Sequence, residues 1–328
     1  MGNTKTTGPY DRTFEQHLTD NGIFLDGYVY PDGRDPPEPK NLEDILQALA
    51  TPRASLDRLS SEDFRKFVRA DCQARREIDV MKNVIPVLDG DIQDHKCVTG
   101  SIQFKNLHQL TDGSLVAGNP VEFYGANPEQ LHQEVRDRIG DFIVPSTQKD
   151  VPIAPSFFLE AKGPGGSPAV ARLQVCYDGA LGARGIHNLR VYGSPGLHNY
   201  DNNAYTITAT YQAGVLKLYT SHPIYVSAER TEFIMMPLMI IALAADLASF
   251  RRGLAAYLNA INWTKGKRDH SIEQANRRVA QGPSTPGDSS GSSLSTEAGS
   301  EACSEASSGA NGDQGMIWSL GSSALAQG

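Results

Sequence analysis

Cysteine is scarce in this chain of 328 residues, and its four copies are far apart. They are Cys72, Cys97, Cys176 and Cys303, and no Cys-x-x-Cys pair occurs. This spacing excludes a disulfide scaffold, a zinc ribbon and a thioredoxin-like redox site. We therefore expect a reduced intracellular compartment, either cytoplasmic or nuclear.

A long uninterrupted apolar run is missing as well. The most apolar stretch, residues 233–250, is broken by Pro237 and Asp246, whereas a membrane-spanning helix needs about 20 apolar residues. We expect a buried core segment there and no transmembrane segment. Residues 1–12 are polar and lack the apolar centre of a secretory signal, so the sequence predicts a protein that is not secreted. The start Met-Gly-Asn-Thr-Lys-Thr fits N-myristoylation at Gly2, and it fits an irregular polar start equally well.

Positive charge is in deficit, with 30 Lys and Arg against 38 Asp and Glu. That balance argues against a strongly basic nucleic-acid coat protein. Much of the acidic excess lies in residues 283–328, which contain no Lys or Arg. This Ser- and Gly-rich segment has no apolar periodicity, so we expect residues 282–328 to form a disordered acidic tail.

The rest of the chain alternates between helical and extended patterns. Residues 1–59 are expected to form an irregular extension with one short helix, over residues 41–50. Residues 60–281 are expected to form one α/β (α+β) domain, with a mixed central sheet flanked by helices. Helices are expected from residue 60 to before Pro86 and over 127–139, 167–184 and 246–280; strands are expected over 97–104, 121–124, 156–162, 205–211 and 215–219.

The strand predicted over residues 156–162 carries the most informative pair of side chains. Side chains alternate along a strand, so Glu160 and Lys162 point to the same face of the sheet. A carboxylate there can hold Mg²⁺, and a lysine can orient a water or stabilise charge on a phosphate. An ordinary ion pair at a strand end explains the same spacing.

Longer stretches around this pair resemble a family of fungal proteins of unknown function. The matching residues include Pro-Ser-Phe-Phe-Leu-Glu-Ala-Lys-Gly-Pro at 155–164, residues 169–185, and Phe-Tyr-Gly-Ala-Asn-Pro-Glu-Gln-Leu at 123–131. The family looks like a branch of the PD-(D/E)XK, or restriction-endonuclease-like, superfamily. The resemblance implies a mixed sheet flanked by helices and Mg²⁺-dependent cleavage of phosphodiesters. It also implies that Glu160 and Lys162 fill the (D/E)XK positions and that Gln174, on the next helix, supports the site.

The chain departs from the family pattern at the first expected metal ligand. The relatives carry Pro-Asp just before the Tyr-Gly-Ala segment, whereas this chain has Pro120-Val121-Glu122. Glu122 is one residue further along and faces the other side of a regular strand, unless a bulge re-aims it. Asp150 is a rival ligand. The candidate metal ligands are therefore Glu122, Asp150 and Glu160.

Two functions follow from these observations. The first is a Mg²⁺-dependent nuclease that uses Glu160, Lys162 and Gln174. The second is a catalytically inactive module that retains the fold and binds nucleic acid or protein. Basic residues of the C-terminal helices could contact nucleic acid or form a solvated helix face: Arg251, Arg252, Lys265, Lys267, Arg268, Arg277 and Arg278.

Overall fold

The computed structural model describes residues 6–92, 94–194, 200–227 and 230–281. The predicted disordered tail and the myristoylation signal at Gly2 lie outside these residues. None of the described helices is both long enough and apolar enough to cross a membrane.

A mixed sheet of seven strands forms the centre of the molecule, in the order β1-β7-β6-β5-β4-β3-β2. β3 (Glu122–Ala126) runs antiparallel to β4 (Ile153–Lys162), and β4 runs parallel to β5 (Thr206–Gln212). The crossover between these parallel strands is the helix α7 (Pro168–Val191). The remaining strands are β1 (Ile23–Phe24), β2 (Val98–Thr99), β6 (Val215–Ser227) and β7 (Arg230–Ala242).

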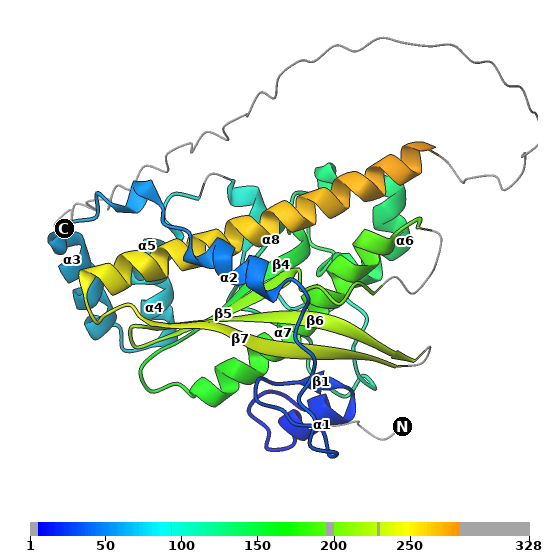
Figure 1. Ribbon diagram of the computed structural model, residues 1–328, viewed down its shortest axis with the longest axis horizontal. Coiled ribbons are helices and arrows are strands. Elements are labelled where there is room, and N and C mark those ends of the chain that lie inside the picture. The colour runs from blue at the N-terminus through cyan, green and yellow to red at the C-terminus, as the bar shows by residue number, and fades with distance from the viewer. Residues whose placement is uncertain (1–5, 93, 195–199, 228–229, 282–328) are drawn as a thin grey trace, which may run out of the picture.

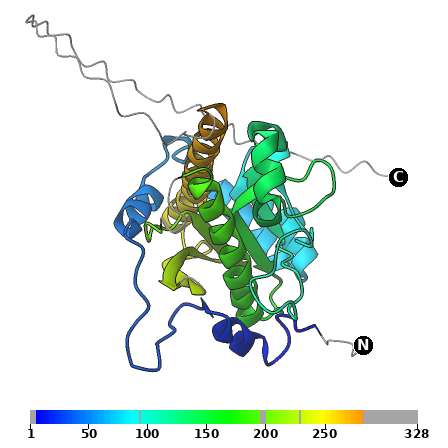
Figure 2. The ribbon, with the colours of Figure 1, turned by 90° about the vertical axis from the view of Figure 1, so that its right-hand side faces the viewer.

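Helices cover both faces of the sheet (Figure 1). α8 (Leu247–Gln281) lies over the face from which Phe157 and Leu159 point, whereas α7 packs against Phe158 on the other face. At one end of the molecule, α6 (Gln133–Ile143) packs beside both long helices (Figure 2). The predicted fold class, a mixed sheet flanked by helices, is confirmed. The other helices are α1 (Phe14–Asp20), α2 (Leu42–Ala50), α3 (Ser61–Gln73), α4 (Glu77–Asn83), α5 (Ile85–Asp89) and the 3₁₀ turns Ala54–Leu56, His95–Cys97 and Pro128–Gln130.

β4 is an inner strand of the sheet, between β5 and β3, and all ten of its residues are buried. Hydrogen-bonded neighbours on both edges and helices on both faces remove it from water, which explains its nearly continuous apolar sequence. Glu160 and Lys162 are therefore polar exceptions within the core.

The structure corrects the sequence interpretation in several places. The helix expected from residue 60 to before Pro86 is divided, because α3 ends at Gln73 and a new helix, α4, begins at Glu77. The strand expected over residues 97–104 is reduced to the two residues of β2. The first 59 residues contain two α-helices rather than one, and β1 joins the edge of the sheet by pairing with β7.

Candidate functional site

Glu160 and Lys162 lie side by side at the C-terminal end of β4, as the strand alternation predicts. Their side chains point to the face covered by α7, because Phe158, two residues earlier, packs against that helix. Lys162 Nζ donates a hydrogen bond to Glu160 Oε2 over 3.2 Å. Glu160 is fully buried and Lys162 is only 4% exposed.

A second carboxylate reaches the pair from α4. Lys162 Nζ also donates to Glu77 Oε2, at 3.2 Å. The two carboxylate oxygens are therefore separated by no more than twice that distance. The Glu77 side chain is 45% exposed, so it marks the point at which the site meets solvent.

Glycine at position 163 allows α4 to approach the end of β4 this closely. A Cβ atom on Gly163 would lie 2.9 Å from the backbone carbonyl carbon of Arg76, the residue that precedes α4. Such a contact would push the start of α4, and with it Glu77, away from Lys162. The glycine after the Glu-Ala-Lys segment thus has a packing role as well as ending the strand.

The position of the first metal ligand expected from the resemblance holds an apolar side chain. Glu122 is paired with Leu159 in the β3–β4 register, so Val121 lies next to Glu160. The only group that Val121 offers to Glu160 is its backbone N–H, which donates to Glu160 Oε1 over 3.2 Å. No carboxylate side chain replaces the aspartate at this position.

Glu122 lies on the opposite face of the sheet from Glu160, since its paired residue Leu159 packs into the cluster under α8. Its neighbours there are Asp89 and Tyr124, and both share hydrogen bonds with it. Burial raises the pKa of Glu122 well above its ordinary value, and the Asp89 charge raises it further. The expected metal ligand Glu122 is thus part of a separate buried carboxyl pair.

Asp150 lies at the wrong end of β4. It is an exposed residue in the loop before the strand, with φ of 65°. Glu160 is seven residues beyond the first residue of the strand, Ile153, which at ~3.3 Å per residue corresponds to about 23 Å. The structure therefore brings neither Glu122 nor Asp150 to Glu160.

The α7 side of the site contributes two further polar residues, one helical turn apart. Asp178 is buried, and its pKa is raised well above the ordinary value, first by burial and then by the negative charge of Glu160. Gln174 Oε1 is buried and has no hydrogen-bond partner among the described residues. No hydrogen bond joins Gln174 to Glu160 or Lys162 in this part of the chain, so its expected supporting role stays a prediction.

Burial and charge act in opposite directions on the central pair. Burial raises the pKa of Glu160 to about 7, although the Lys162 charge pulls it downward. Burial lowers the pKa of Lys162, but the charges of Glu160 and Glu77 outweigh it and the net shift is upward. Lys162 is therefore a firmly charged cation, and near neutral pH Glu160 can exchange a proton.

The donor set fits a divalent cation of the Mg²⁺ type. The described residues contain no cluster of three or more His, Cys, Asp or Glu side chains arranged to hold a metal. Mg²⁺, however, usually binds one or two carboxylates together with waters and substrate phosphates. Glu77 and Glu160 supply two carboxylates, and the unpartnered Oε1 of Gln174 is a neutral oxygen on the helix covering the same face. The Lys162 ammonium contacts both carboxylates and balances only one of the two negative charges that they carry when ionised, which leaves one negative charge for a bound cation.

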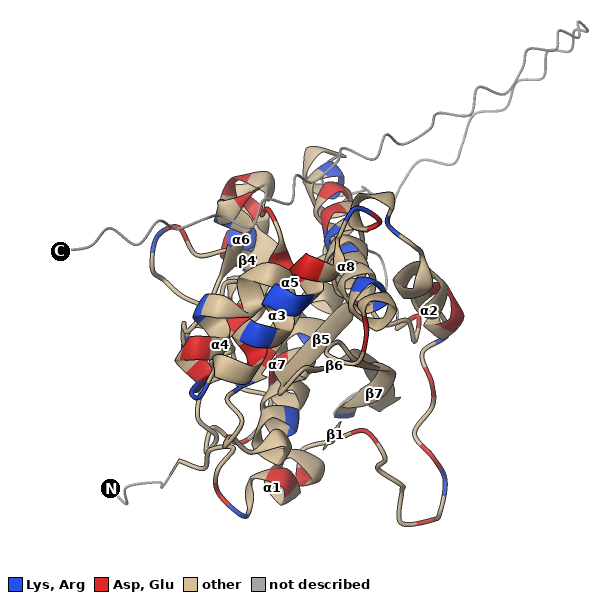
Figure 3. Cartoon of the chain, turned by 90° about the vertical axis from the view of Figure 1, so that its left-hand side faces the viewer, with Lys and Arg blue, Asp and Glu red and all other residues tan. Residues whose placement is uncertain are grey.

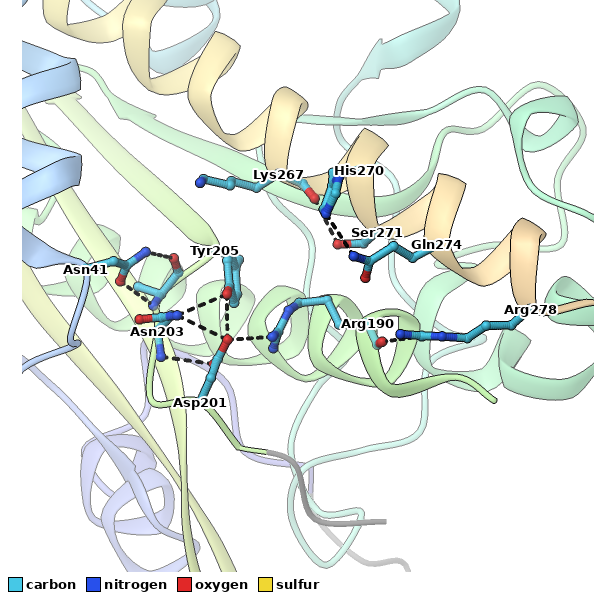
Figure 4. Close-up of polar contacts among 11 residues, drawn as sticks. Asn41, Arg190, Asp201, Asn203, Tyr205, Lys267, His270, Ser271, Gln274 and Arg278 are labelled. Carbon is cyan, nitrogen blue, oxygen red and sulfur yellow. Dashed lines mark hydrogen bonds and ion pairs between the residues drawn. The ribbon is translucent and has the colours of Figure 1, made fainter. Parts of the chain in front are cut away.

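A second polar cluster, between α7, α8 and residues 200–205, satisfies itself internally (Figure 4). Arg190 forms an ion pair with Asp201 and lies over the ring of Tyr205, whose hydroxyl donates to the same carboxylate. Arg278 of α8 donates to the carbonyl oxygens of Arg190 and Tyr192, at the end of α7. These contacts hold α7, α8 and residues 200–205 together.

Most cations of the proposed basic surface on α8 also have internal partners. Arg251 donates to backbone carbonyls of residues 57 and 59, and Arg268 is buried against Ser156. Lys265 and Arg277 pair with acids one turn away on the same helix. Five of the seven cations on this helix are therefore engaged within the chain, whereas the exposed Arg252 and Lys267 have no acidic partner among the described residues.

Sequence reasoning missed Glu77 and Asp178. Glu77 is distant in the chain from Lys162, and its acidic position in a first helical turn is usual for any helix N-terminus. Asp178 could have been found from the sequence, because it is an acidic residue on the sheet-facing side of a helix whose other residues there are mostly apolar or small. An acidic side chain in such a position is costly to bury without a function. Comparisons with protein-family models, with curated proteins and with solved structures found nothing that matches this chain.

Proposed function

We propose that the protein is a PD-(D/E)XK-like nuclease that hydrolyses phosphodiester bonds of nucleic acid with Mg²⁺. The observation that carries the proposal is the arrangement of Lys162 between the carboxylates of Glu160 and Glu77 at the end of a buried strand. A charged trio in the core is costly unless its members are paired or functional, and Glu77 keeps this trio in contact with solvent.

In this proposal, Glu77 takes the place of the missing aspartate as the second carboxylate. Glu160 and Glu77 would hold Mg²⁺, which when bound polarises a phosphoryl oxygen. Lys162 Nζ then hydrogen-bonds the attacking water and stabilises negative charge on the phosphate. The backbone N–H of Val121 fixes the orientation of the Glu160 carboxylate, and burial excludes bulk water from its inner oxygen.

The order of elements supports the same proposal. A strand, an antiparallel neighbour, a crossover helix and a parallel strand follow each other as β3, β4, α7 and β5. This is the mixed sheet flanked by helices that the resemblance implies, with the Glu-x-Lys segment on the inner strand β4.

The competing proposal, an inactive module that retains the fold, is favoured by a specific observation. Val121 offers Glu160 a backbone N–H and no carboxylate, and the Lys162 ammonium already pairs with both carboxylates that remain. In that case the trio is a structural ion pair that fixes α4 on the end of β4.

Cleavage assays distinguish the two functions. The full chain would be incubated with labelled single- and double-stranded DNA and RNA, over a series of Mg²⁺ and Mn²⁺ concentrations. We expect metal-dependent cleavage that Lys162→Ala lowers at least ~100-fold, the lower range for loss of one charge-stabilising group. The rate should rise with pH through about 7, because Glu160 must lose its proton to bind a cation.

The controls separate loss of chemistry from loss of folding. Glu77→Gln should abolish cleavage as Glu160→Gln does, whereas Lys265→Ala, which removes an exposed lysine paired on α8, should leave it unchanged. Circular dichroism spectra establish that each variant is folded. Absence of cleavage in the folded wild-type protein at every metal concentration would reject the nuclease proposal in favour of the inactive module.

A further inference from the structure

A groove outside the candidate site is lined by residues of α3, α4 and α5. Figure 3 shows these three helices. Its volume is about 830 Å³. One wall is a stripe along α3, at the three- and four-residue spacing that places side chains on one helix face. The other wall comes from the outer side of α4 and from the start of α5. The lining residues used below are Lys66, Arg69, Arg75, Asp79 and Lys82.

Four of the charged residues that line this groove are cations, and all four are exposed. Lys66, Lys82 and the guanidinium of Arg75 form no hydrogen bond or salt bridge with any other residue that the structure describes. Arg69 has a long contact of 3.5 Å with Glu62 at the rim. Lys66, Arg75 and Lys82 thus bring to the groove positive charge that no salt bridge within the described part of the chain neutralises.

The acidic residues near the groove already have partners. Asp79, the one acid among the lining residues, pairs with Arg76 at 3.1 Å. At the rim, Glu62 receives two hydrogen bonds from Arg65, at 3.1 and 2.8 Å. These partners neutralise the acids, so an anion entering the groove meets a net positive field.

Most cations of α8 differ from those of the groove, because they are engaged within the chain. On α8, Arg251, Arg268 and Arg278 are committed to carbonyl oxygens or buried groups, and Lys265 and Arg277 to carboxylates on the same helix. An external phosphate would have to displace those partners. In the groove, Lys66, Arg75 and Lys82 have no salt-bridge partner among the described residues that it would have to displace.

We propose that the groove between α3 and α4 binds the phosphate backbone of a nucleic acid. A phosphate chain fits because the cations follow each other along two helices and are not gathered around one point. They are also long, flexible side chains that contact phosphates without reading bases. Glu77 points inward from α4, whereas Asp79 and Lys82 line the groove on the outer side. The groove is thus separated from the candidate site by about the ~10 Å width of a helix. It is a binding surface in its own right and does not depend on catalysis.

Fluorescence anisotropy tests the proposal with the full chain and EDTA present, so that no cleavage interferes. The probes are a labelled oligothymidylate, a duplex of equal length and inorganic phosphate as competitor. We expect the triple variant Lys66→Gln, Arg69→Gln and Lys82→Gln to raise the Kd for the oligonucleotides at least ~10-fold at low salt. The slope of log K against log salt should fall by about 2 to 3, roughly one unit for each cation that no longer binds a phosphate.

The matched control carries the same charge change on α8: Lys265→Gln, Lys267→Gln and Arg277→Gln. It should keep wild-type affinity and slope. The inference is overturned if the control triple loses affinity while the groove triple does not, or if neither changes it. It is also overturned if the folded wild type binds vesicles containing phosphatidylserine but no oligonucleotide, or if inorganic phosphate competes as well per phosphate as the oligonucleotide does.

Discussion

At the scale of one residue, Asp89 is a buried carboxyl group whose pKa is raised. It accepts hydrogen bonds from the hydroxyls of Tyr124, at 3.1 Å, and Tyr257, at 2.9 Å, and it lies beside Glu122. Burial raises the pKa of Asp89 to about 6 despite these hydrogen bonds. Two carboxyl groups so close together in the core cannot both ionise at low cost, so the pair keeps a proton to higher pH than an isolated carboxyl group would.

Asp89→Asn should change how stability depends on pH. The pKa of Asp89 is higher in the folded chain than the ordinary 3.8, so between about pH 4 and 6 the folded state binds more protons than the unfolded state. Wild-type stability therefore falls as pH rises through this window, by up to about 3 kcal/mol for a shift of this size. The Asn variant lacks that dependence and still accepts hydrogen bonds from both tyrosines.

Urea unfolding at several pH values measures the difference between the two proteins. Asp246→Asn is a control of opposite sign, because Ser249 lowers the pKa of Asp246 and its contribution is lost as the pH falls. If the difference between wild type and Asp89→Asn is constant from pH 4 to 7, Asp89 is not a raised-pKa carboxyl and the description of this pair is wrong.

Among the elements, α7 depends on small residues to lie close to the sheet. A Cβ atom on Gly182 would lie 2.6 Å from the ring of Phe158 and 3.1 Å from the carbonyl oxygen of Pro155. Phe158 is fully buried and cannot move aside without disturbing β4, which carries Glu160 two residues later.

Gly182→Ala should therefore destabilise the protein by roughly 1–3 kcal/mol, the usual cost of overpacking a core. Gly266, inside α8, is the matched control, since its added Cβ would meet nothing within 4 Å. Gly266→Ala should stabilise the protein by up to about 1 kcal/mol through helix propensity. Chemical denaturation measures both changes, and equal shifts in the same direction would show that α7 does not pack as closely as described.

The elements also show what sequence could and could not predict. β4 and its polar pair were predictable because strand alternation is a local rule, and Glu160 and Lys162 obey it. The end of α3 at Gln73 and the new start at Glu77 were not, since no proline or glycine separates them and the break is set by packing against the end of β4. The contact of Glu77 with Lys162 joins residues 85 positions apart, which no local pattern reveals.

At the scale of the whole molecule, the sheet separates two groups of buried carboxyls. Asp89 and Glu122 lie under α8, whereas Glu160 and Asp178 lie on the α7 side. The α8 group accepts hydrogen bonds from tyrosine hydroxyls and contains no cation among the described residues, so its carboxyl groups have raised pKa values and a structural role. The α7 group contains Lys162 and extends to the partly exposed Glu77, which makes it the group suited to chemistry.

The central claim is that Glu77 and Glu160 together form a site for a divalent cation. The most direct measurement is the anomalous difference map of a crystal soaked in Mn²⁺, which substitutes for Mg²⁺ at oxygen sites. We predict a peak in contact with carboxylate oxygens of both Glu77 and Glu160, with Lys162 displaced from at least one of them. A map without a peak at this position, in which Lys162 still bridges the two carboxylates at saturating Mn²⁺, would contradict the account.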